Sequence, residues 1–329
     1  MAGVSIATVS RALTNPGRVN AATRERVLEV VRRIGYTPNL AGRNLRAARS
    51  MMVLVVVPTF ITPFFSELLL GVDRALSAGG YGLLVGNLHD RPEKEAHLVD
   101  LVFAGAADGV LLLDGHVLRT EDRSLADSGV PMVAVSVPPA AEMPQVLVGE
   151  REAATAVAEH LLALGHRRFG YVTGPPANYI EHERWAGFSG ALALAGIPAE
   201  AIARYPGDFH VGSGVQAAQR FLSAPERPTA VFAISDMMAI GFMRALHAAG
   251  LTVPRDVSVV GYDGIEFADY CEPPLTTVRQ PREAMGRAAA ELLLRLIAGE
   301  AIPPAERILR LEAALRPAES TAPPQPLAS

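Results

Sequence analysis

The sequence lacks the features that mark secreted and membrane proteins. A single cysteine, Cys271, among 329 residues excludes an internal disulfide framework, and we interpret this thiol as structural. No apolar run approaches the ~18 residues of a membrane span, because the best candidate, 51–57, has only the length of a strand. The N-terminus does not have the charged, apolar and small-residue regions of a secretory signal. These absences favour a cytoplasmic protein without a membrane partner.

The motifs of common enzymes are missing as well. The chain contains no G-x-S-x-G, no H-E-x-x-H and no Walker loop, and the glycines between 71 and 82 do not form a dinucleotide fingerprint. Glu159, His160 and His166 lie close together without metal-ligand spacing, so we interpret them as a solvated face. We therefore expect no enzyme activity, no cofactor and no metal.

Charge is distributed unevenly along the chain. The net charge is −4, yet residues 1–50 carry nine arginines against two glutamates, a balance of +7. The remaining residues carry 21 basic and 32 acidic groups, a balance of −11. A basic segment on an acidic body is the pattern expected of a DNA-binding head. The alternative is a basic solubilising tail, but this segment has the patterning of helices.

The basic segment predicts two helices. Ser5 can cap a helix over about 6–13, and the residues Thr-Asn-Pro-Gly at 14–17 predict a turn. Asn20 can cap a second helix, which Gly35 would end. Apolar residues of this second helix follow the i, i+3, i+4, i+7 spacing: Val27, Val30, Val31 and Ile34.

From residue 51 onward, strand-like and helix-like segments alternate. Strands are expected over about 52–57, 81–87, 109–113, 131–136, 168–173, 230–233 and 257–261. Helices are expected over about 64–77, 93–103, 151–164, 181–195, 237–249 and 282–298, with a helical stretch between the third and fourth strands. This alternation predicts an α/β core of two doubly wound subdomains, each a parallel sheet with helices on both faces.

Residues 2–13 have the composition of the turn and recognition helix of a helix-turn-helix. Such a helix needs small or polar residues toward the DNA groove and apolar residues toward its partner helix. The first kind is supplied by Ala7, Thr8, Ser10 and Arg11, and the second by Val4, Val9 and Leu13. Gly3 permits the sharp turn before the helix.

The segment 2–46 resembles the head of the LacI/GalR family of regulators almost residue for residue: AGVSIATVSRALTNPGRVNAATRERVLEVVRRIGYTPNLAGRNLR. The resemblance implies that Ile6 and Ala7 tune operator preference and that Arg11 contacts a base edge. DNA-backbone contacts are implied for Thr8, Ser10, Asn20 and Thr23, and the DNA-binding set also includes Ser5, Asn39 and Leu45. Phosphate contacts position such a head, and base contacts specify the sequence.

Residues 39–46 resemble the family hinge helix, which forms on DNA and lies in the minor groove. Leu45 matches the leucine that wedges a base step apart. The alternative for Leu45 is that it only covers apolar core. Gly42 replaces the usual alanine, at a cost of roughly 1 kcal/mol in helix propensity, so we expect this hinge to fold less readily.

The rest of the chain resembles the same family along its whole length, through five ordered motifs. These motifs are GHRRFGYVTGP (165–175), ERWAGF (183–188), PTAVFAISDMMAIGFMRAL (228–246), VPRDVSVVGYDG (253–264) and PPLTTVRQP (273–281). The resemblance implies a periplasmic-binding-protein fold with the effector between two doubly wound halves. Open α/β sheets bind ligands at the carboxyl ends of their strands.

The resemblance also implies effector-binding residues. Arg184 matches the arginine that grips the effector, and Asp263 matches the aspartate that accepts bonds from its hydroxyls. The alternative for each is a surface salt bridge. Phe64 and Phe65 occupy the slot where a ring covers a sugar face, although one of them could belong to the core. Asn87, followed by His89 and Asp90, is a further candidate.

Four positions depart from the usual pattern of the family. Ser235 stands where many members have asparagine, and Ser136 stands near a common acidic residue. Arg282 occupies a place often taken by an aromatic residue, and Gly264 replaces a frequent second aspartate. The expected pocket therefore has less carboxylate and more positive charge, which leans toward a sugar acid or a phosphate.

These observations give a domain plan. We expect a helix-turn-helix head over 1–38, a hinge and linker over 39–50, an effector-binding core over 51–316 and a flexible tail over 317–329. Within the core, subdomain one is expected to comprise 51–148 and 281–304, and subdomain two 149–278 and 307–316. The family head normally has one more helix before the turn, so we expect this head to lack its first helix, to be loose and to bind operator poorly.

The function expected is that of an effector-responsive repressor of a carbohydrate or sugar-acid operon, with near-palindromic operator DNA and a sugar or sugar derivative as partners. The alternative is a sugar-binding protein with a vestigial head; an enzyme on the doubly wound fold finds no supporting motif. A homodimer is expected, with residues 64–77 in the dimer face, because one head contacts only half of a palindrome. The C-terminal sequence lacks a leucine heptad, so a tetramer is not expected.

Overall fold

The computed structural model describes residues 2–14, 16–35, 49–88, 92–113, 115–138 and 142–325. The chain forms two compact units, a head over 1–50 and a core over 51–329. The predicted hinge helix, with Asn39 and Leu45, lies outside the described residues, as do His89 and Asp90. None of the helices in the described segments is long and apolar enough to cross a membrane.

The head consists of α1 (Ile6–Thr14), the short 3-10 helix η1 (Pro16–Arg18) and α2 (Ala21–Ile34). The predicted caps are present: the Ser5 hydroxyl accepts a bond from the Thr8 amide at 3.2 Å, and the Asn20 side chain accepts one from Ala22 at 3.0 Å. Gly35 ends α2 with a φ of 63°, in the left-handed region that favours glycine. The predicted helix starts and the predicted glycine stop are therefore confirmed.

The head buries a small contact between its two helices. Ala12 of α1 and Val27 of α2 are buried, whereas Ile34, the last residue of the predicted apolar stripe, is 50% exposed. Ile6, at the start of α1, is 89% exposed. The apolar stripe of α2 is thus buried at its beginning and open to solvent at its end.

The first lobe of the core is built on a six-stranded sheet in the order β11-β5-β4-β3-β1-β2. All its neighbouring strands are parallel. The strands are β1 (Met52–Val57), β2 (Gly82–Asn87), β3 (Gly109–Leu112), β4 (Met132–Val135), β5 (Gln145–Val148) and β11 (Ile308–Leu311). Its helices are α4 (Phe64–Ala78), α5 (Pro92–Phe103), α10 (Arg282–Ile297) and the short η2 (Leu125–Ser128) and η5 (Pro304–Glu306).

Strand β1 shows why this sheet is covered on both faces. Five of its six residues are buried, and successive side chains point to opposite faces. Val53 and Val55 pack in one cluster with side chains of α4 and α10. Leu54 and Val56 pack in a second cluster with side chains of α5. A continuous apolar strand is therefore satisfied on both sides.

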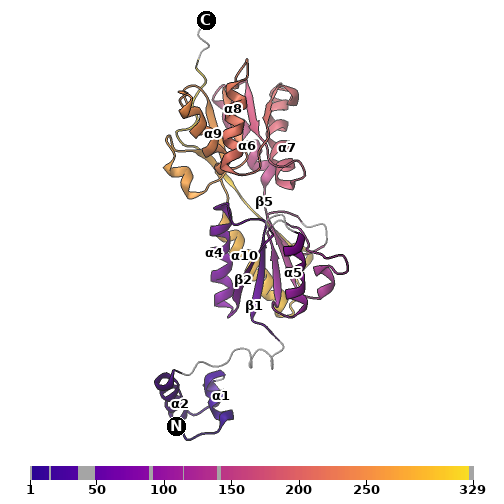
Figure 1. The fold of residues 1–329 in the computed structure, drawn as a ribbon, viewed down its shortest axis with the longest axis vertical. Coiled ribbons are helices and arrows are strands. Elements are labelled where there is room, and N and C mark those ends of the chain that lie inside the picture. The colour runs from indigo at the N-terminus through magenta and orange to yellow at the C-terminus, as the bar shows by residue number, and fades with distance from the viewer. Residues whose placement is uncertain are drawn as a thin grey trace. The chain divides into compact units, whose positions relative to one another are not determined.

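The second lobe repeats the plan with the order β12-β10-β9-β8-β6-β7, in which only β12 is antiparallel to its neighbour. Its strands are β6 (Phe169–Val172), β7 (Ala203–Tyr205), β8 (Ala230–Ala233), β9 (Ser258–Asp263), β10 (Thr276–Arg279) and β12 (Ala314–Arg316). Its helices are α6 (Glu150–Ala163), α7 (Tyr179–Leu194), α8 (Val211–Leu222), α9 (Asp236–Ala248) and the short η3 (Ala199–Ala201) and η4 (Glu266–Tyr270). Figure 1 shows the two sheets with their separate sets of helices. The predicted fold class is confirmed.

The chain passes between the lobes after β5, after β10 and between β11 and β12. The last crossing corrects one predicted boundary. Residues 307–316 were expected in the second lobe, but Ile308–Leu311 pairs in parallel with Gln145–Val148 of the first sheet. Only β12 belongs to the second lobe, because the final two strands are divided between the sheets.

The prediction of a flexible tail is wrong for residues 317–325. Ser320 is fully buried; its hydroxyl donates to the Val259 carbonyl at 2.6 Å and accepts from the Thr276 amide at 2.8 Å. The buried ring of His166 bonds the Ala322 carbonyl at 2.9 Å, and His160 bonds Thr321 at 3.0 Å. These two histidines therefore hold the tail, and the expected solvated face is wrong for them.

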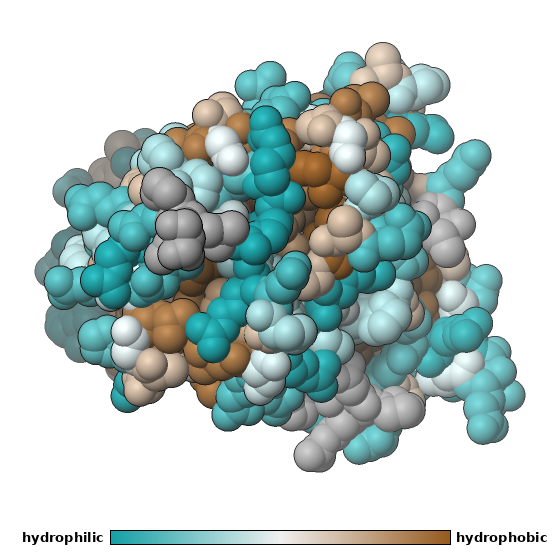
Figure 2. All heavy atoms as spheres, turned by 90° about the horizontal axis from the view of Figure 1, so that it is seen from above, coloured by the Kyte–Doolittle hydropathy of each residue, from teal (hydrophilic) through white to brown (hydrophobic). Residues whose placement is uncertain are grey.

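Other differences concern short elements. The helical stretch expected between β3 and β4 is only the four-residue η2, and the alternation pattern did not predict α8, β5, β7, β10, β11 or β12. The missed strands have three or four residues, too few to establish a period, and the twelve-residue α8 was missed although it is long. On the face of the molecule seen in Figure 2, polar side chains surround smaller apolar groups.

Candidate functional site

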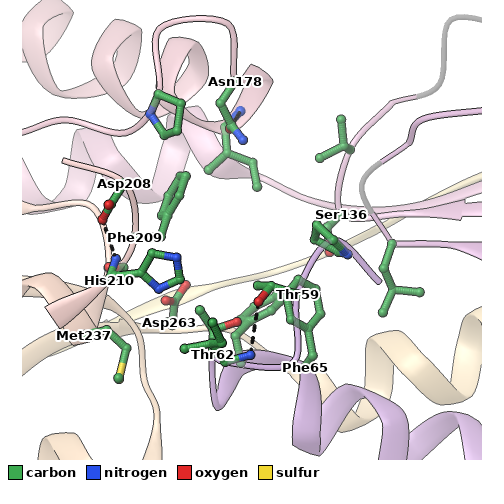
Figure 3. Close-up of a pocket in the computed structure, with 18 of the residues that line it drawn as sticks. Thr59, Thr62, Phe65, Ser136, Asn178, Asp208, Phe209, His210, Met237 and Asp263 are labelled. Atoms are coloured by element: carbon green, nitrogen blue, oxygen red, sulfur yellow. Dashed lines mark hydrogen bonds between the residues drawn. The ribbon is translucent and has the colours of Figure 1, made fainter. Parts of the chain in front are cut away.

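A cavity of about 600 Å³ lies between the two lobes of the core. It opens at the carboxyl ends of strands, because Thr59 follows β1, Ser136 follows β4 and Asp263 ends β9. Ligands of open α/β sheets bind at this edge. Figure 3 shows Asn178, Asp208, Phe209 and His210 of the second lobe facing Thr59, Thr62, Phe65 and Ser136 of the first.

Backbone strain is concentrated in the wall of this cavity. Among the described residues, four that are not glycine have a positive φ, and three of them border the cavity. These three are Ser136 with φ 69°, Phe209 with φ 68° and Asp263 with φ 113°. Such conformations cost free energy and cluster at ligand sites, where the surrounding structure maintains them. The surrounding fold therefore holds the cavity wall in this conformation.

Arg184 is the most enclosed charge of the site. It projects from α7, whose first turn is capped by the Asn178 side chain at 2.8 Å from the Ile180 amide. Its Nε donates to Glu150 Oε2 at 2.8 Å, and its Nη1 donates to the Ile234 carbonyl. The guanidinium also lies 3.5 Å from the centre of the Tyr262 ring. Glu150 and this ring therefore already satisfy much of its charge and fix its orientation.

Asp263 faces Arg184 across the cavity wall. Its Oδ1 lies 3.8 Å from Arg184 Nη2 and accepts a hydrogen bond from Gln280 Nε2 at 3.0 Å. Burial raises the pKa of the Asp263 carboxyl above its usual range, and the nearby Arg184 and Arg282 oppose that shift. The group can accept bonds from hydroxyls of a ligand when it is ionised.

Several buried polar atoms around the cavity have no hydrogen-bond partner within the described part of the chain. They include Thr62 Oγ1, Ser136 Oγ and Gln280 Oε1, and all three residues line the cavity. A buried polar atom without a partner is destabilising, so each one in a native fold needs an explanation. The cavity wall therefore contains polar side chains whose hydrogen-bonding capacity the described fold leaves unused.

The structure brings together six of the eight predicted effector residues: Phe64, Phe65, Ser136, Arg184, Ser235 and Asp263. Phe64 and Phe65 meet edge to face with ring centres 5.1 Å apart and also pack against the core of the first lobe. Ser235 caps α9, because its hydroxyl accepts from the Met238 amide at 3.3 Å. Roles in effector binding remain predictions for these residues.

Asn87 and Arg282 do not line the cavity, and the expectation for them is corrected. Asn87 ends the edge strand β2 beside Val57, the last residue of β1, and is not among the described residues that line the cavity. Arg282 is buried behind the wall; its Nε donates to Glu67 at 3.1 Å, and its Nη2 forms an ion pair with Glu67 at 2.8 Å. Its charge is therefore balanced by Glu67, and the positive pocket expected from Arg282 is not present.

The sequence interpretation missed several residues of the second lobe that line the cavity. Asp208, Phe209 and His210 lie between β7 and α8, and the Asp208 carboxylate accepts from the His210 amide at 2.9 Å. Neither neighbouring element was predicted, so no strand end marked this loop. The available signal was the turn dipeptide Pro206-Gly207 just before Asp208.

The predicted DNA-facing residues of the head lie on α1 and the start of α2. Ile6, Ala7 and Arg11 are exposed, and Thr8 is half-buried. Asn20 and Thr23 lie at the start of α2, with Asn20 exposed. Ser5 is exposed, and the side chain of Ser10 lies outside the described set. The first turns of α1 are therefore open to solvent.

Two family models match the chain, that of bacterial regulatory proteins of the lacI family over residues 1–39 and that of a periplasmic binding protein-like domain over residues 158–321. The HTH-type transcriptional repressor CytR of Escherichia coli (strain K12) is 38% identical over 96% of this chain and 93% of its own length. A complex of the transcriptional regulator CelR with cellobiose is 35% identical, covers 97% of each chain and has a TM-score of 0.74.

The lac repressor dimer bound to operator and the anti-inducer ONPF is 27% identical, covers 98% of this chain and 96% of its own, and has a TM-score of 0.84. These matches extend over the head and both lobes of the core. Together with the cavity between the lobes, they show that the chain belongs to the lacI family of bacterial regulatory proteins.

Proposed function

We propose that this chain is a DNA-binding transcriptional repressor whose operator affinity is set by a small molecule in the cavity between the lobes. The observation that carries the proposal is the strained cavity wall, with its aromatic and polar side chains, on the same chain as a basic helix-turn-helix head. The relatives CytR and CelR are named as transcriptional regulators, and the lac repressor is named as bound to operator. The family is regulatory, and we infer regulation without catalysis, in the cytoplasm where the operator lies.

The effector that the cavity favours is a neutral compound with several hydroxyl groups, such as a sugar or sugar derivative. The cavity is bordered by the carboxylates of Asp208 and Asp263, which repel anions and accept bonds from hydroxyls. Its buried cation, Arg184, is already paired with Glu150. The unpartnered Ser136 and Gln280 oxygens add neutral polar contacts. These contacts support a neutral sugar over the sugar acid that the sequence favoured.

Aromatic side chains supply the remaining surface. Phe64 and Phe65 lie on the first-lobe side, and Phe209 lies on the second-lobe side. Sugar rings bind such faces through their C–H groups while their hydroxyls bond polar residues. The structure of CelR, which is 35% identical, holds the sugar cellobiose.

On the DNA side, Ile6, Ala7 and Arg11 would contact bases in the major groove, with Asn20 and Thr23 on phosphates. The expected partner is a near-palindromic operator bound by a homodimer. Exposed apolar residues suit such a dimer: Leu70 of α4 is 42% exposed. Phe267 and Tyr270 of η4 are 57% and 78% exposed.

The test has two steps. The full chain is screened by calorimetry against ribose, cellobiose, gluconate and glucose 6-phosphate, and DNA duplexes that it binds are selected from a random pool. Operator affinity is then measured by fluorescence anisotropy with and without the bound compound. A neutral sugar that changes operator affinity supports the proposal. Selection of no DNA sequence would instead favour a sugar-binding protein with a vestigial head.

A further inference from the structure

Arg282 of the first lobe bonds a turn of the second lobe that forms part of the cavity wall. Arg282 is the first residue of α10, directly after the chain has crossed from β10 into the first lobe. Its side chain is 1% exposed. Nη1 donates to the Asp263 carbonyl at 2.7 Å, and Nη2 donates to the Gly264 carbonyl at 2.9 Å. Nε also donates to Glu67 Oε2 on α4 at 3.1 Å, and Nη2 lies 2.8 Å from Glu67 Oε1 in an ion pair.

The second-lobe end of this contact is a strained turn. Asp263 has a φ of 113° and Gly264 a φ of 66°, so two successive residues have positive φ. A backbone of this kind persists only where its surroundings hold it. The planar guanidinium fork holds both carbonyls of the turn at once, which a lysine could not do with the same geometry. The direction of the Asp263 side chain, and so of its carboxylate in the cavity, depends on this turn.

The first-lobe end of the contact is a rigid helix pair. A Cβ placed on Gly71 of α4 would lie 2.0 Å from the Glu283 carbonyl, and one on Gly286 of α10 would lie 2.0 Å from the Leu68 carbonyl. The two backbones therefore touch at both glycines, and the helices can move only together. Phe64 and Phe65, which border the cavity, occupy the first turn of α4.

We propose that Arg282, held by Glu67 in the first lobe and bonded to the Asp263 and Gly264 carbonyls of the second, forms a clasp that transmits occupancy of the cavity from the Asp263–Gly264 turn to the α4–α10 pair. Arg282 is a positioning residue in this scheme, since it does not line the cavity itself. The inference rests on the proposed function, because transmission has meaning only where an effector changes operator affinity. A compound that moves Asp263 then also moves α4, the helix expected in the dimer face.

The chain offers a matched control for the clasp. Arg74 and Glu283 form a second ion pair between α4 and α10, with side chains 61% and 45% exposed. That pair joins the same two helices but has no contact with the Asp263–Gly264 turn. Glu283→Gln therefore removes only an ion pair between α4 and α10, whereas Glu67→Gln weakens the clasp. Both changes keep the size of the side chain and so create no buried void.

The first experiment measures coupling. The operator dissociation constant of the full chain is measured with and without saturating cellobiose or ribose, for wild type, Glu67→Gln, Arg282→Lys, Arg282→Met and Glu283→Gln. A wild-type coupling of roughly tenfold is typical of allosteric proteins. We expect about a fivefold or greater loss of the ratio in Glu67→Gln and Arg282→Met, partial rescue in Arg282→Lys and the full ratio in Glu283→Gln. Unchanged ratios in the clasp variants, or equal loss in Glu283→Gln, would overturn the clasp.

The second experiment needs no effector. The hydrogen exchange of two backbone amides at the turn is measured in the full chain. The Gly264 amide donates to Thr277, and the Ile265 amide donates to Asp236. We expect faster exchange of these amides by about fivefold or more in Arg282→Met and Glu67→Gln, with Glu283→Gln as wild type. If no sugar affects operator binding, the proposed function fails, but the exchange measurement still tests the clasp. Exchange at the wild-type rate in both clasp variants would show that the clasp does not hold the turn.

Discussion

At the residue scale, Arg184 and Asp263 have different roles in the cavity. Arg184 is held by Glu150 and by the Tyr262 ring, so it is a fixed donor, whereas Asp263 retains an oxygen that can accept a ligand hydroxyl. A buried group that is fixed before binding loses little conformational entropy when a ligand arrives. The site is therefore preorganised around this pair.

Replacing either member of this pair should abolish the effector response while operator binding survives. Arg184→Ala or Asp263→Ala is expected to weaken sugar binding by roughly two orders of magnitude, since each leaves a buried partner unpaired. Calorimetry measures sugar binding, and anisotropy measures operator binding. Arg151→Ala is the matched control, because Arg151 pairs with Glu183 between α6 and α7 at the surface. Unchanged sugar affinity in both pocket variants would remove the pair from the site.

Sugar binding should also depend on pH. Burial raises the pKa of Asp263, so the group takes up a proton closer to neutral pH than an ordinary aspartate does. A protonated carboxyl loses its attraction to Arg184 and half of its acceptor capacity. Sugar affinity is therefore expected to fall several-fold as the pH is lowered from about 8 to about 6. Because the raised pKa belongs to the folded state, this group's contribution to folding stability instead declines as pH rises through that range.

The Asp263→Asn variant separates this effect from other titrations. It removes this titrating group but keeps an acceptor oxygen, so its sugar affinity should be lower and should change less with pH; burial raises the pKa of the neighbouring Asp236 to about 8, so that group still titrates. Calorimetry at several pH values makes the comparison. A wild-type affinity that does not change with pH would show that Asp263 is not the acceptor.

The sequence identified the residues of the site that lie in long motifs and missed those beside short elements. Arg184, Ser235 and Asp263 follow predictable strands or open predictable helices. Asp208 follows a strand of only three residues, which has no detectable period. Arg282 was placed in the cavity because it occupies a position where the family often has an aromatic residue. The start of α10 instead carries Arg282 behind the wall.

At the element scale, the contact of α4 with α10 determines how the first lobe can respond to a ligand. Gly286 allows this contact, because a Cβ there would lie 2.0 Å from the backbone of Leu68. Gly286→Ala is therefore expected to lower the free energy of unfolding by roughly 1–3 kcal/mol or more, as overpacking does in cores. Urea unfolding followed by circular dichroism provides the measurement.

Gly190 gives the matched control in another helix. It lies within α7, and a Cβ added there would meet nothing within 4 Å, so Gly190→Ala adds helix propensity without a clash. This variant should raise the free energy of unfolding by up to about 1 kcal/mol. The close contact assigned to α4 and α10 is wrong if both substitutions have the same sign.

Elements with strong local signals were predictable, and elements that depend on distant partners were not. Asn20 and Gly35 begin and end α2 through their own backbone preferences, so the sequence identified both. The tail around Ser320 has the composition of a frayed end, yet it pairs with β9 and β10 through Val259 and Thr276. No local pattern encodes such pairing, because the partners lie far away in sequence.

At the scale of the whole molecule, two lobes joined by three crossings suit a protein that changes the angle between its halves. A regulator of this kind acts as a pair, since one head contacts half of a palindrome. We expect a homodimer in solution by light scattering, with Leu70→Glu on α4 shifting it toward monomer. A stable tetramer, or a dimer indifferent to that substitution, would contradict the expected face.

The central claim is that sugar binding in the cavity and operator binding by the head are thermodynamically linked in one chain. Linkage requires that the factor by which a sugar changes operator affinity equals the factor by which operator changes sugar affinity. The most direct measurement is this pair of factors, from anisotropy of a selected operator with and without sugar and from calorimetry of the sugar with and without operator. We predict two equal factors of roughly tenfold, within the usual range of allosteric coupling. A sugar that occupies the cavity yet leaves operator affinity unchanged would contradict the account.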